Sequence, residues 1–206
     1  MYKNCFKRVL DFIMSLAGLI ILSPVFLILC IWIKLDSKGP ILFKQKRVGR
    51  NKEYFNILKF RTMSIDTPKD TPTHLLENPE QYITKAGKFM RKTSLDELPQ
   101  IINILAGQMS VIGPRPALWN QYDLIEERDR YHANDIRPGL TGWAQINGRD
   151  ELEIDVKAKL DGEYVDKLSF LFDVKCFFGT ITSVLRHDGV VEGGTGELQK
   201  KDVNRE

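Results

Sequence analysis

The apolar positions of the chain are unevenly distributed, and the longest apolar run lies near the N-terminus. No charged residue occurs from Phe12 to Ile33, a run of 22 residues. A helix rising about 1.5 Å per residue over this length can reach across a hydrocarbon core about 30 Å thick. The run is apolar on every side, unlike a core helix, and no A-x-A-like cleavage site follows it, unlike a signal peptide. The pattern therefore predicts a membrane segment.

Two features of this segment bear on whether it crosses the membrane. Ser23 and Pro24 lie in its middle, where proline removes an amide donor and kinks a helix, and the serine hydroxyl is expected to bond a nearby carbonyl. Basic residues, which are enriched on cytoplasmic flanks, occur on both sides: Lys3, Lys7 and Arg8 before it, and Lys34, Lys38, Lys44, Lys46 and Arg47 after it. Together they favour a re-entrant helix-break-helix hairpin, although a straight span with a tolerated proline stays open.

The rest of the chain alternates short apolar clusters with turn signals. Two segments, Ile41–Gln45 and Tyr54–Phe60, predict a β-hairpin around the turn at Val48–Asn51. Helical spacing predicts five helices: Thr84–Lys92, Leu98–Leu105, Trp119–His132, Ile154–Tyr164 and Phe170–Arg186. The prolines and glycines predict a loop at Thr67–Glu80 and turns at Gly139–Gly142 and Asn147–Arg149.

These elements predict a mainly helical α+β fold. We expect a re-entrant membrane helix over residues 1–36, a compact helical domain with a small β-hairpin over 37–187, and a flexible tail over 188–206. The phenylalanines of the last helix suit either the core or a bilayer interface.

Composition narrows the class of protein. With 43% hydrophobic and 28% charged residues among 206, the chain is not extensively disordered. Its three cysteines lie far apart, which excludes a disulfide framework and a zinc site and suits a reducing compartment. The net charge is only +3, but Lys38 to Arg61 alone carries +7. Beside a membrane segment, such a surface favours anionic lipid headgroups or a phosphate substrate over nucleic acid.

The motifs of several enzyme classes are absent from the sequence, among them GxxxxGK[ST], GxGxxG, HExxH, GxSxG and D-x-D. The strongest candidate is Ser94–Gln100, which contains Asp96 and Glu97. One interpretation is helix capping by Ser94 or by Asp96, and Pro99 favours Asp96 because proline is tolerated in a first turn. The other is chemical: a helix N-terminus binds phosphate and keeps Asp96 ionised, as a nucleophile toward phosphorus. Glu97 would then bind Mg²⁺ together with phosphate oxygens.

Phosphoryl transfer also needs cations that absorb the charge of the transition state. Six basic residues lie within or beside apolar or Gly/Pro-punctuated motifs: Lys59, Arg61, Arg91, Arg115, Arg137 and Arg149. Each alone suits a solvated surface charge, but the set favours phosphate binding.

Five of these motifs, in this order, resemble the bacterial sugar transferase family, the small monotopic phosphoglycosyl transferases. They are Ser23-Pro24, Lys59–Met63, Arg91–Gln100, Ile112–Pro116 and Arg137–Arg149, and the resemblance runs from about Tyr2 to Val190. It implies transfer of a phospho-sugar from a UDP-sugar to undecaprenyl phosphate, with release of UMP. It also implies a re-entrant anchor in the cytoplasmic leaflet of the inner membrane and a role in the first membrane step of surface polysaccharide or glycoconjugate synthesis.

The resemblance also implies roles for single residues. Asp96 would attack the sugar-side phosphorus and form a covalent intermediate, and Glu97 would serve catalysis by binding Mg²⁺. The residues that would bind substrate phosphates or order the site are Lys59, Arg91, Arg115 and Arg149, with Arg61, Arg137 and Gln145 matching family motifs.

Two alternatives remain open at this level. One is a membrane-anchored glycosyltransferase that releases UDP, against which the missing D-x-D weighs. The other is a membrane-tethered basic module without catalysis, in which Asp96 and Glu97 only cap a helix. The sequence does not identify the sugar, the glycan, the choice of Mg²⁺ over Mn²⁺, or the oligomeric state, a homodimer included.

Overall fold

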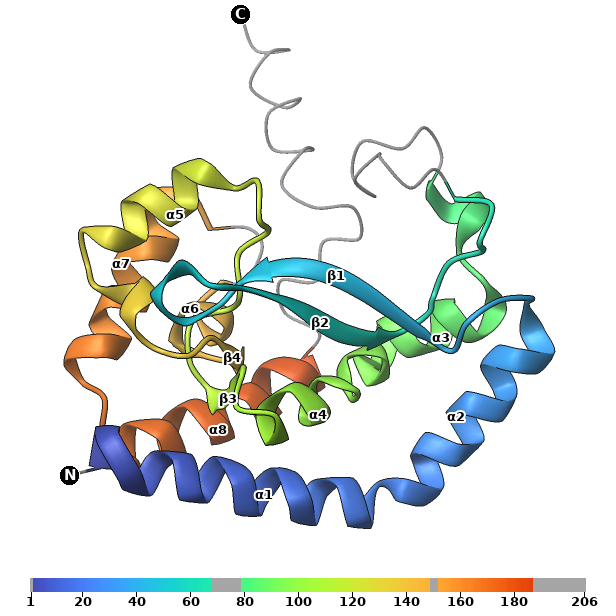
Figure 1. The fold of residues 1–206 in the computed structure, drawn as a ribbon, viewed down its shortest axis with the longest axis horizontal. Helices are drawn as coiled ribbons and strands as arrows, with labels where there is room; N and C mark the ends of the chain where they lie inside the picture. Colours follow the sequence, from blue (N-terminus) through green and yellow to red (C-terminus); the bar gives the residue numbers. More distant parts are fainter. Residues whose placement is uncertain (1, 68–78, 149–151, 187–206) are drawn as a thin grey trace, which may run out of the picture.

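The computed structural model describes residues 2–67, 79–148 and 152–186, and over these ranges the fold is mainly helical with a β-hairpin (Figure 1). Its helices are α1 (Lys7–Ile21), α2 (Ser23–Asp36), α3 (Lys85–Thr93), α4 (Gln100–Leu105), α5 (Tyr122–Asp129), α6 (Trp143–Ile146), α7 (Ile154–Asp166) and α8 (Phe170–Arg186). Its strands are β1 (Leu42–Val48), β2 (Tyr54–Phe60), β3 (Ser110–Ile112) and β4 (Gly139–Thr141). The predicted tail at 188–206 and most of the predicted Thr67–Glu80 loop lie outside the described residues.

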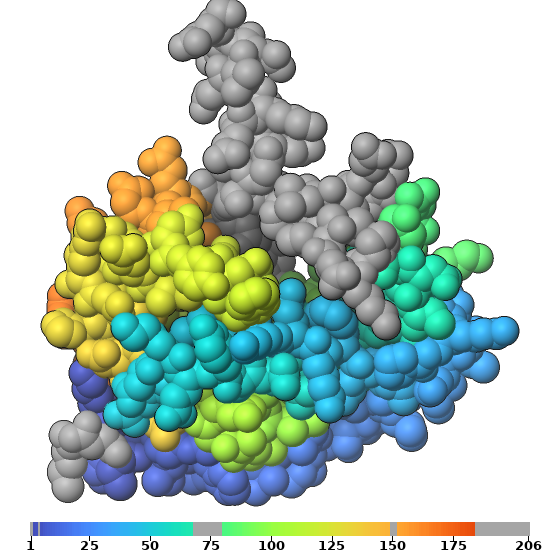
Figure 2. Space-filling model, turned by 45° about the horizontal axis from the view of Figure 1, so that its top comes forward, coloured from blue at the N-terminus to red at the C-terminus, as the bar shows by residue number. Residues whose placement is uncertain are grey.

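The predicted apolar segment forms two helices with a sharp bend between them. α1 and α2 meet at an angle of 61°, and the Ser23 hydroxyl donates to the carbonyl of Ile20 at 2.8 Å, as expected. Within the described ranges no single helix is long and apolar enough to cross a bilayer, whereas this bent pair is, by length and composition. In Figures 1 and 2 the pair forms one continuous edge of the molecule below the hairpin strands.

Helix α1 has its polar side chains inside and its apolar ones outside. Asp11 and Ser15, one turn apart, are buried against the domain. Asp11 accepts hydrogen bonds from the Ser110 hydroxyl at 2.8 Å and from the Val111 amide at 3.0 Å, which fixes α1 to β3. The opposite face exposes Val9, Phe12, Ile13, Leu16 and Ile20. A helix of an ordinary soluble domain has the reverse pattern.

Helix α2 anchors the same unit to the domain through its apolar side. Leu29 and Ile33 are buried in a cluster with Phe60 of β2 and with Ala86 and Met90 of α3. Burying a side chain of this size contributes about 2 kcal/mol. Both helices of the bent pair are therefore attached to the domain, α1 through Asp11 and α2 through Leu29 and Ile33.

The predicted β-hairpin is confirmed, with antiparallel pairing from Leu42↔Phe60 to Val48↔Tyr54. Strand β1 extends three residues beyond the predicted end at Gln45, because the turn lies later, at Gly49–Glu53. Asn51 and Lys52 adopt positive φ there, which closes the turn between the two strands.

The predicted helices differ from the observed ones mainly at their ends. α3 begins after Thr84, whose hydroxyl accepts from the Gly87 amide, and α7 and α8 lie where expected. The helix predicted at Trp119–His132 is too long. Gln121 uses its side-chain oxygen to accept from the Leu118 amide, so α5 starts at Tyr122.

A parallel strand pair was not predicted, and the turn predicted at Gly139–Gly142 is wrong because Gly139–Thr141 forms strand β4. β4 pairs with β3 in the register Ser110↔Gly139 and Ile112↔Thr141. The backbones approach so closely that a Cβ on Gly139 would lie 2.1 Å from the Gly113 nitrogen. The glycines were a sequence signal for this pairing, because glycine permits two backbones to approach closely. They did not show which segments pair, because the two strands are distant in the chain. The predicted turn at residues 147–148 is confirmed.

Candidate active site

Asp96 and Glu97 lie together in a single 3₁₀ turn, Leu95–Glu97, between α3 and α4. Ser94, at φ +56°, reverses the chain after α3 and so directs this turn toward β2. Both capping interpretations are wrong, because α4 begins only at Gln100 and neither turn nor helix has a side-chain cap. The pair is thus available for other contacts.

Glu97 is held by two cations. Lys59 Nζ lies 2.9 Å from its Oε1, and Arg115 donates to Oε1 at 2.7 Å and to Oε2 at 3.4 Å. Burial alone would raise the pKa of Glu97, but Arg115 and Lys59 overcome it and hold the pKa well below its usual range. Glu97 is therefore a permanent carboxylate.

Asp96 stands beside the same cations in a different state. Its side chain is 14% exposed, and Lys59 Nζ lies 4.0 Å from Oδ2, beyond hydrogen-bond distance. Among the described residues none donates a hydrogen bond to this carboxylate. Burial and the neighbouring Glu97 raise the pKa of Asp96, and the attraction of Lys59, Arg91 and Arg115 only partly offsets this. The helix N-terminus expected at Asp96 is wrong, because α4 begins at Gln100, and burial raises the pKa that such a terminus would lower.

The cations reach the pair from three elements. Lys59 comes from β2, Arg91 from the last turn of α3, and Arg115 from the segment after β3. Arg91 donates from Nε to the Thr62 hydroxyl at 3.0 Å, which fixes its direction. Sequence reasoning missed Thr62 as a positioning residue, although it lies inside the predicted motif Lys59–Met63.

Other predicted site residues lie elsewhere. Arg61 is 5% exposed and donates to the backbone of Ser37 and Lys38, joining the end of α2 to the hairpin. Arg137 donates to the Gly107 carbonyl at 2.9 Å, beyond the far end of α4. Gln145, in α6, donates to the Leu140 carbonyl, and its buried Oε1 has no partner among the described residues. Arg149 lies outside those residues.

A divalent cation fits this cluster only with help from a substrate. The described residues contain no group of three potential metal-binding side chains. Mg²⁺ typically takes one or two carboxylates and completes its shell with phosphate oxygens and water, and Asp96 and Glu97 supply such carboxylates. The weaker contact at Glu97 Oε2, 3.4 Å from Arg115, leaves that oxygen the better ligand.

The structure thus combines a cluster of two carboxyl groups and three cations with exposed apolar helix faces. A family model described as bacterial sugar transferase matches residues 2–187, and the chain belongs to this family. It is accordingly an enzyme, a sugar transferase.

Three relatives illustrate the family. The chain is 38% identical over 184 residues to the uncharacterized sugar transferase EpsL of Bacillus subtilis, covering 89% of each chain. It is 38% identical to the exopolysaccharide production protein PSS of Rhizobium leguminosarum, covering 87% of this chain and 94% of that one. It is 40% identical to the UDP-glucose:undecaprenyl-phosphate glucose-1-phosphate transferase of Escherichia coli, covering 85% of this chain and 39% of that protein. The chain therefore spans about two fifths of the longer relatives' length.

Proposed function

We propose that this protein transfers a phospho-sugar from a UDP-sugar to undecaprenyl phosphate and releases UMP. An ionised oxygen of Asp96 attacks the sugar-side phosphorus, and the bond to the UMP oxygen breaks as UMP leaves. The acceptor phosphate then attacks the same phosphorus, and the aspartate carboxylate leaves. The product is a diphosphate-linked sugar, and Asp96 returns to its starting state.

The observation that carries this proposal is the contrast between two adjacent carboxyl groups. Environments that push two pKa values apart mark different chemical roles. Glu97 is paired with Lys59 and Arg115, so it suits a role in orienting charged groups at the site. Asp96 has oxygens not engaged by hydrogen bonds from described residues, faces the cations, and suits attack on phosphorus.

The cations suit a diphosphate substrate. Lys59, Arg91 and Arg115 surround the carboxylates and would absorb negative charge that builds up on the transferred group. Glu97 would hold Mg²⁺, which when bound would screen the charge of the donor diphosphate.

The names of the relatives support the choice of donor and acceptor. The relatives from Escherichia coli and Klebsiella pneumoniae are both named for transfer of glucose 1-phosphate from UDP-glucose to undecaprenyl phosphate. Shorter relatives are named for exopolysaccharide production. We accordingly propose a UDP-hexose donor and a place early in surface polysaccharide synthesis.

The apolar outer face supports a site at the membrane surface. Besides α1, exposed apolar residues lie on α2 and α8: Leu27, Ile28, Ile31, Leu35, Phe170, Leu171, Phe178 and Ile181. Patches of this kind on a folded protein mark membrane or protein contacts. We propose that the bent pair enters one leaflet of the inner membrane from the cytoplasm and returns. A lipid-linked phosphate would then meet the Asp96 cluster at headgroup level.

Nucleotide release tests the function. Purified protein receives undecaprenyl phosphate, Mg²⁺ and a panel of UDP-sugars, and we expect UMP from one donor. Asp96→Asn should reduce this at least about a thousandfold, because an amide cannot act as the nucleophile. Asp166→Asn, an exposed change of the same kind, is the control and should leave turnover intact. Release of UDP in place of UMP would contradict phospho-sugar transfer, and full activity of Asp96→Asn would contradict the nucleophile.

A further inference from the structure

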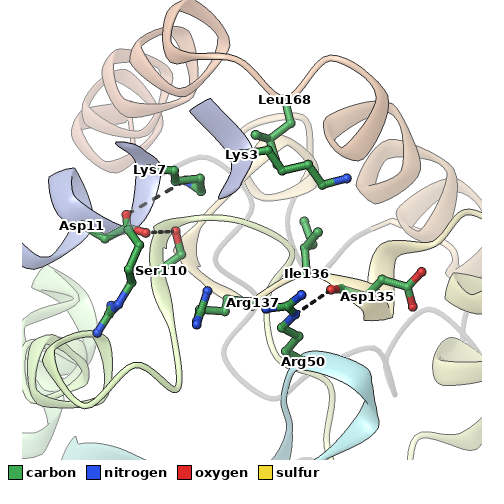
Figure 3. Close-up of a pocket in the computed structure, with 10 residues that line it drawn as sticks. Lys3, Lys7, Asp11, Arg50, Ser110, Asp135, Ile136, Arg137 and Leu168 are labelled. Atoms are coloured by element: carbon green, nitrogen blue, oxygen red, sulfur yellow. Dashed lines mark hydrogen bonds and ion pairs between the residues drawn. The ribbon is translucent and has the colours of Figure 1, made fainter. Parts of the chain in front are cut away.

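A second cluster of basic side chains surrounds a cavity that the proposed chemistry does not use. The cavity, about 240 Å³, lies between the N-terminal segment and the loop before β4 (Figure 3). Its charged lining residues are the basic Lys3, Lys7, Arg8, Arg50 and Arg137 and the acidic Asp11 and Asp135. Lys3 and Lys7 approach from the N-terminal segment, and Arg50 and Arg137 from the facing side.

Several of these charges already have partners. Lys7 pairs with Asp173 of α8 at 2.7 Å, and Asp11 is held by Ser110 and Val111. Arg8 donates to the carbonyls of Ile104 and Leu105 at the end of α4. Among the described residues this leaves Lys3, Arg50 and Arg137 without a carboxylate partner, whereas the carboxylate of Asp135 contacts His132 Nδ1 at 3.1 Å.

Both remaining arginines are fixed through one nitrogen only. Arg50 Nε donates to the Asp135 carbonyl at 3.0 Å, and Arg137 Nε donates to the Gly107 carbonyl at 2.9 Å. Within the described ranges their terminal nitrogens and the Lys3 amine make no hydrogen bond or ion pair. An arginine oriented by Nε presents two parallel N–H groups, the geometry that suits a phosphate group.

Like charges are gathered here at an electrostatic cost. Burial lowers the pKa of Arg137, and the nearby charges of Arg8 and Arg50 lower it further. Positive charges held around a half-enclosed space repel one another, which costs free energy. A bound anion would relieve this repulsion. Arg50 and Arg137 also line an adjoining cavity of about 390 Å³, so a ligand has room to extend.

This cluster is separate from the Asp96 cluster. Asp96 precedes α4, whereas Arg8 and Arg137 bind carbonyls at or beyond its other end. The six residues of α4 span about 9 Å at 1.5 Å per residue. None of Lys59, Arg91, Asp96, Glu97 and Arg115 lines either cavity.

We propose that Lys3, Arg50 and Arg137 form a second anion site that binds a phosphate group, distinct from the site of phosphoryl transfer. The phosphate can belong to an anionic lipid headgroup or to a soluble phosphate compound. The site adjoins the first turn of α1, whose outer face is apolar, so a lipid in the same leaflet would reach it with its headgroup.

Binding by the full chain tests this site with two probes. The first is inorganic pyrophosphate, measured by equilibrium dialysis in phosphatidylcholine nanodiscs. The second is phosphatidylglycerol mixed into those nanodiscs, measured as a rise in melting temperature over phosphatidylcholine alone. The test variant is Lys3→Gln/Arg50→Gln, in which both changed side chains are exposed. Lys52→Gln is the control, since Lys52 shares the turn of Arg50 but pairs with Asp129 outside the cavity.

We expect the double variant to bind at least about tenfold more weakly, since each lost hydrogen bond to a charged group is worth about that factor. Lys52→Gln should bind as the unchanged protein does. Weaker binding of pyrophosphate by the double variant identifies a soluble phosphate ligand. A smaller effect of phosphatidylglycerol, with pyrophosphate binding unchanged, identifies a lipid headgroup. Arg137→Gln provides a second variant with the same expected loss.

Three results would overturn the proposal. They are no binding of either probe, equal weakening by Lys52→Gln, and weakening only by Arg115→Gln, which alters the Asp96 cluster. The last result would assign the bound phosphate to the proposed transfer site, and so separates failure of this inference from failure of the proposed function.

Discussion

At the scale of single residues, the central feature is that neighbouring carboxyl groups in one turn have opposite environments. Glu97 receives two cations at hydrogen-bond distance, whereas Asp96 has its nearest cation at 4.0 Å. The direction of each pKa shift follows from this difference of about one ångström in contact distance and from burial. Adjacent positions in the sequence give no indication of it.

The two carboxyl groups should therefore affect stability with opposite sign. Because the pKa of Asp96 is raised in the folded state, its ionisation costs more in the folded protein than in the unfolded chain. The folded protein therefore loses stability as pH rises from the pKa of the unfolded chain to that of the folded state. Asp96→Asn should stabilise the protein at neutral pH, because it removes a buried charge. The lowered pKa of Glu97 means a stabilising contribution that is present above its unfolded pKa and lost as pH falls through the folded one. Glu97→Gln should destabilise the protein by about 3 kcal/mol, because Lys59 and Arg115 lose their carboxylate partner. Denaturant unfolding measures both, and equal signs would contradict the assignment.

The pH dependence of turnover should report Asp96. Only the ionised carboxylate attacks phosphorus, so activity should fall as pH decreases through a pKa that lies above the ordinary aspartate value. Arg91→Gln removes one of the cations that lower this pKa, and should move the acidic limb to higher pH. An acidic limb unchanged by Arg91→Gln would show that another group controls it.

At the scale of elements, the site depends on the contact between α3 and the residues that follow β2. Gly87 of α3 lies against the backbone at Thr62, and Thr62 in turn fixes Arg91. A Cβ on Gly87 would lie 2.0 Å from the Thr62 carbonyl oxygen. The separation of these two elements therefore sets the place of one cation relative to Asp96.

Replacement of this glycine tests the contact. Gly87→Ala should destabilise the protein by about 1–3 kcal/mol, because backbone must move to admit the methyl group. It should also reduce turnover through displaced Arg91. Gly18→Ala in α1 is the matched control, since its methyl group would meet Ile101 at 3.8 Å, an ordinary contact. Thermal unfolding and nucleotide release measure the two effects, and equal behaviour of both variants would refute the contact.

Among the helices and strands, the periodicity of apolar residues predicts some elements well and others poorly. The hairpin and the long helices α7 and α8 follow from local patterns, so their positions were predicted to within a few residues. The start of α4 was predicted two residues early, at Leu98, because Ser94 adopts positive φ and the next three residues form a 3₁₀ turn. The pairing of β3 with β4 joins segments nearly thirty residues apart, and no local signal specifies it.

At the scale of the whole molecule, the N-terminal segment is held to the domain at both ends. Tyr2 and Lys7 bond Asp173 of α8, and Leu29 and Ile33 are packed against β2 and α3. A straight span would separate the first residues from Asp173 by the thickness of a bilayer. These contacts support a hairpin with both ends on one side.

Straightening the bend tests this topology. Ser23→Ala/Pro24→Ala should restore a continuous helix and move the N-terminus across the membrane. The exposed Cys5 reports the N-terminus, whereas Cys176 is buried and its thiol pKa is raised to about 12, so it should not react. Lys38→Cys reports the other end. An impermeant maleimide outside spheroplasts should label Cys5 only in the double variant, and identical labelling of both proteins would contradict the hairpin.

The sequence by itself determined the apolar segment with its central break, the β-hairpin, the principal helices, and the motif that contains Asp96 and Glu97. These depend on local composition and periodicity, which a linear chain displays directly. Only the tertiary structure decided that Lys59, Arg91 and Arg115 meet that motif while Arg61 and Arg137 lie elsewhere. The reason is that cations on different elements are equivalent in sequence. Their distances, and hence their effect on a carboxyl group, arise only when the elements pack.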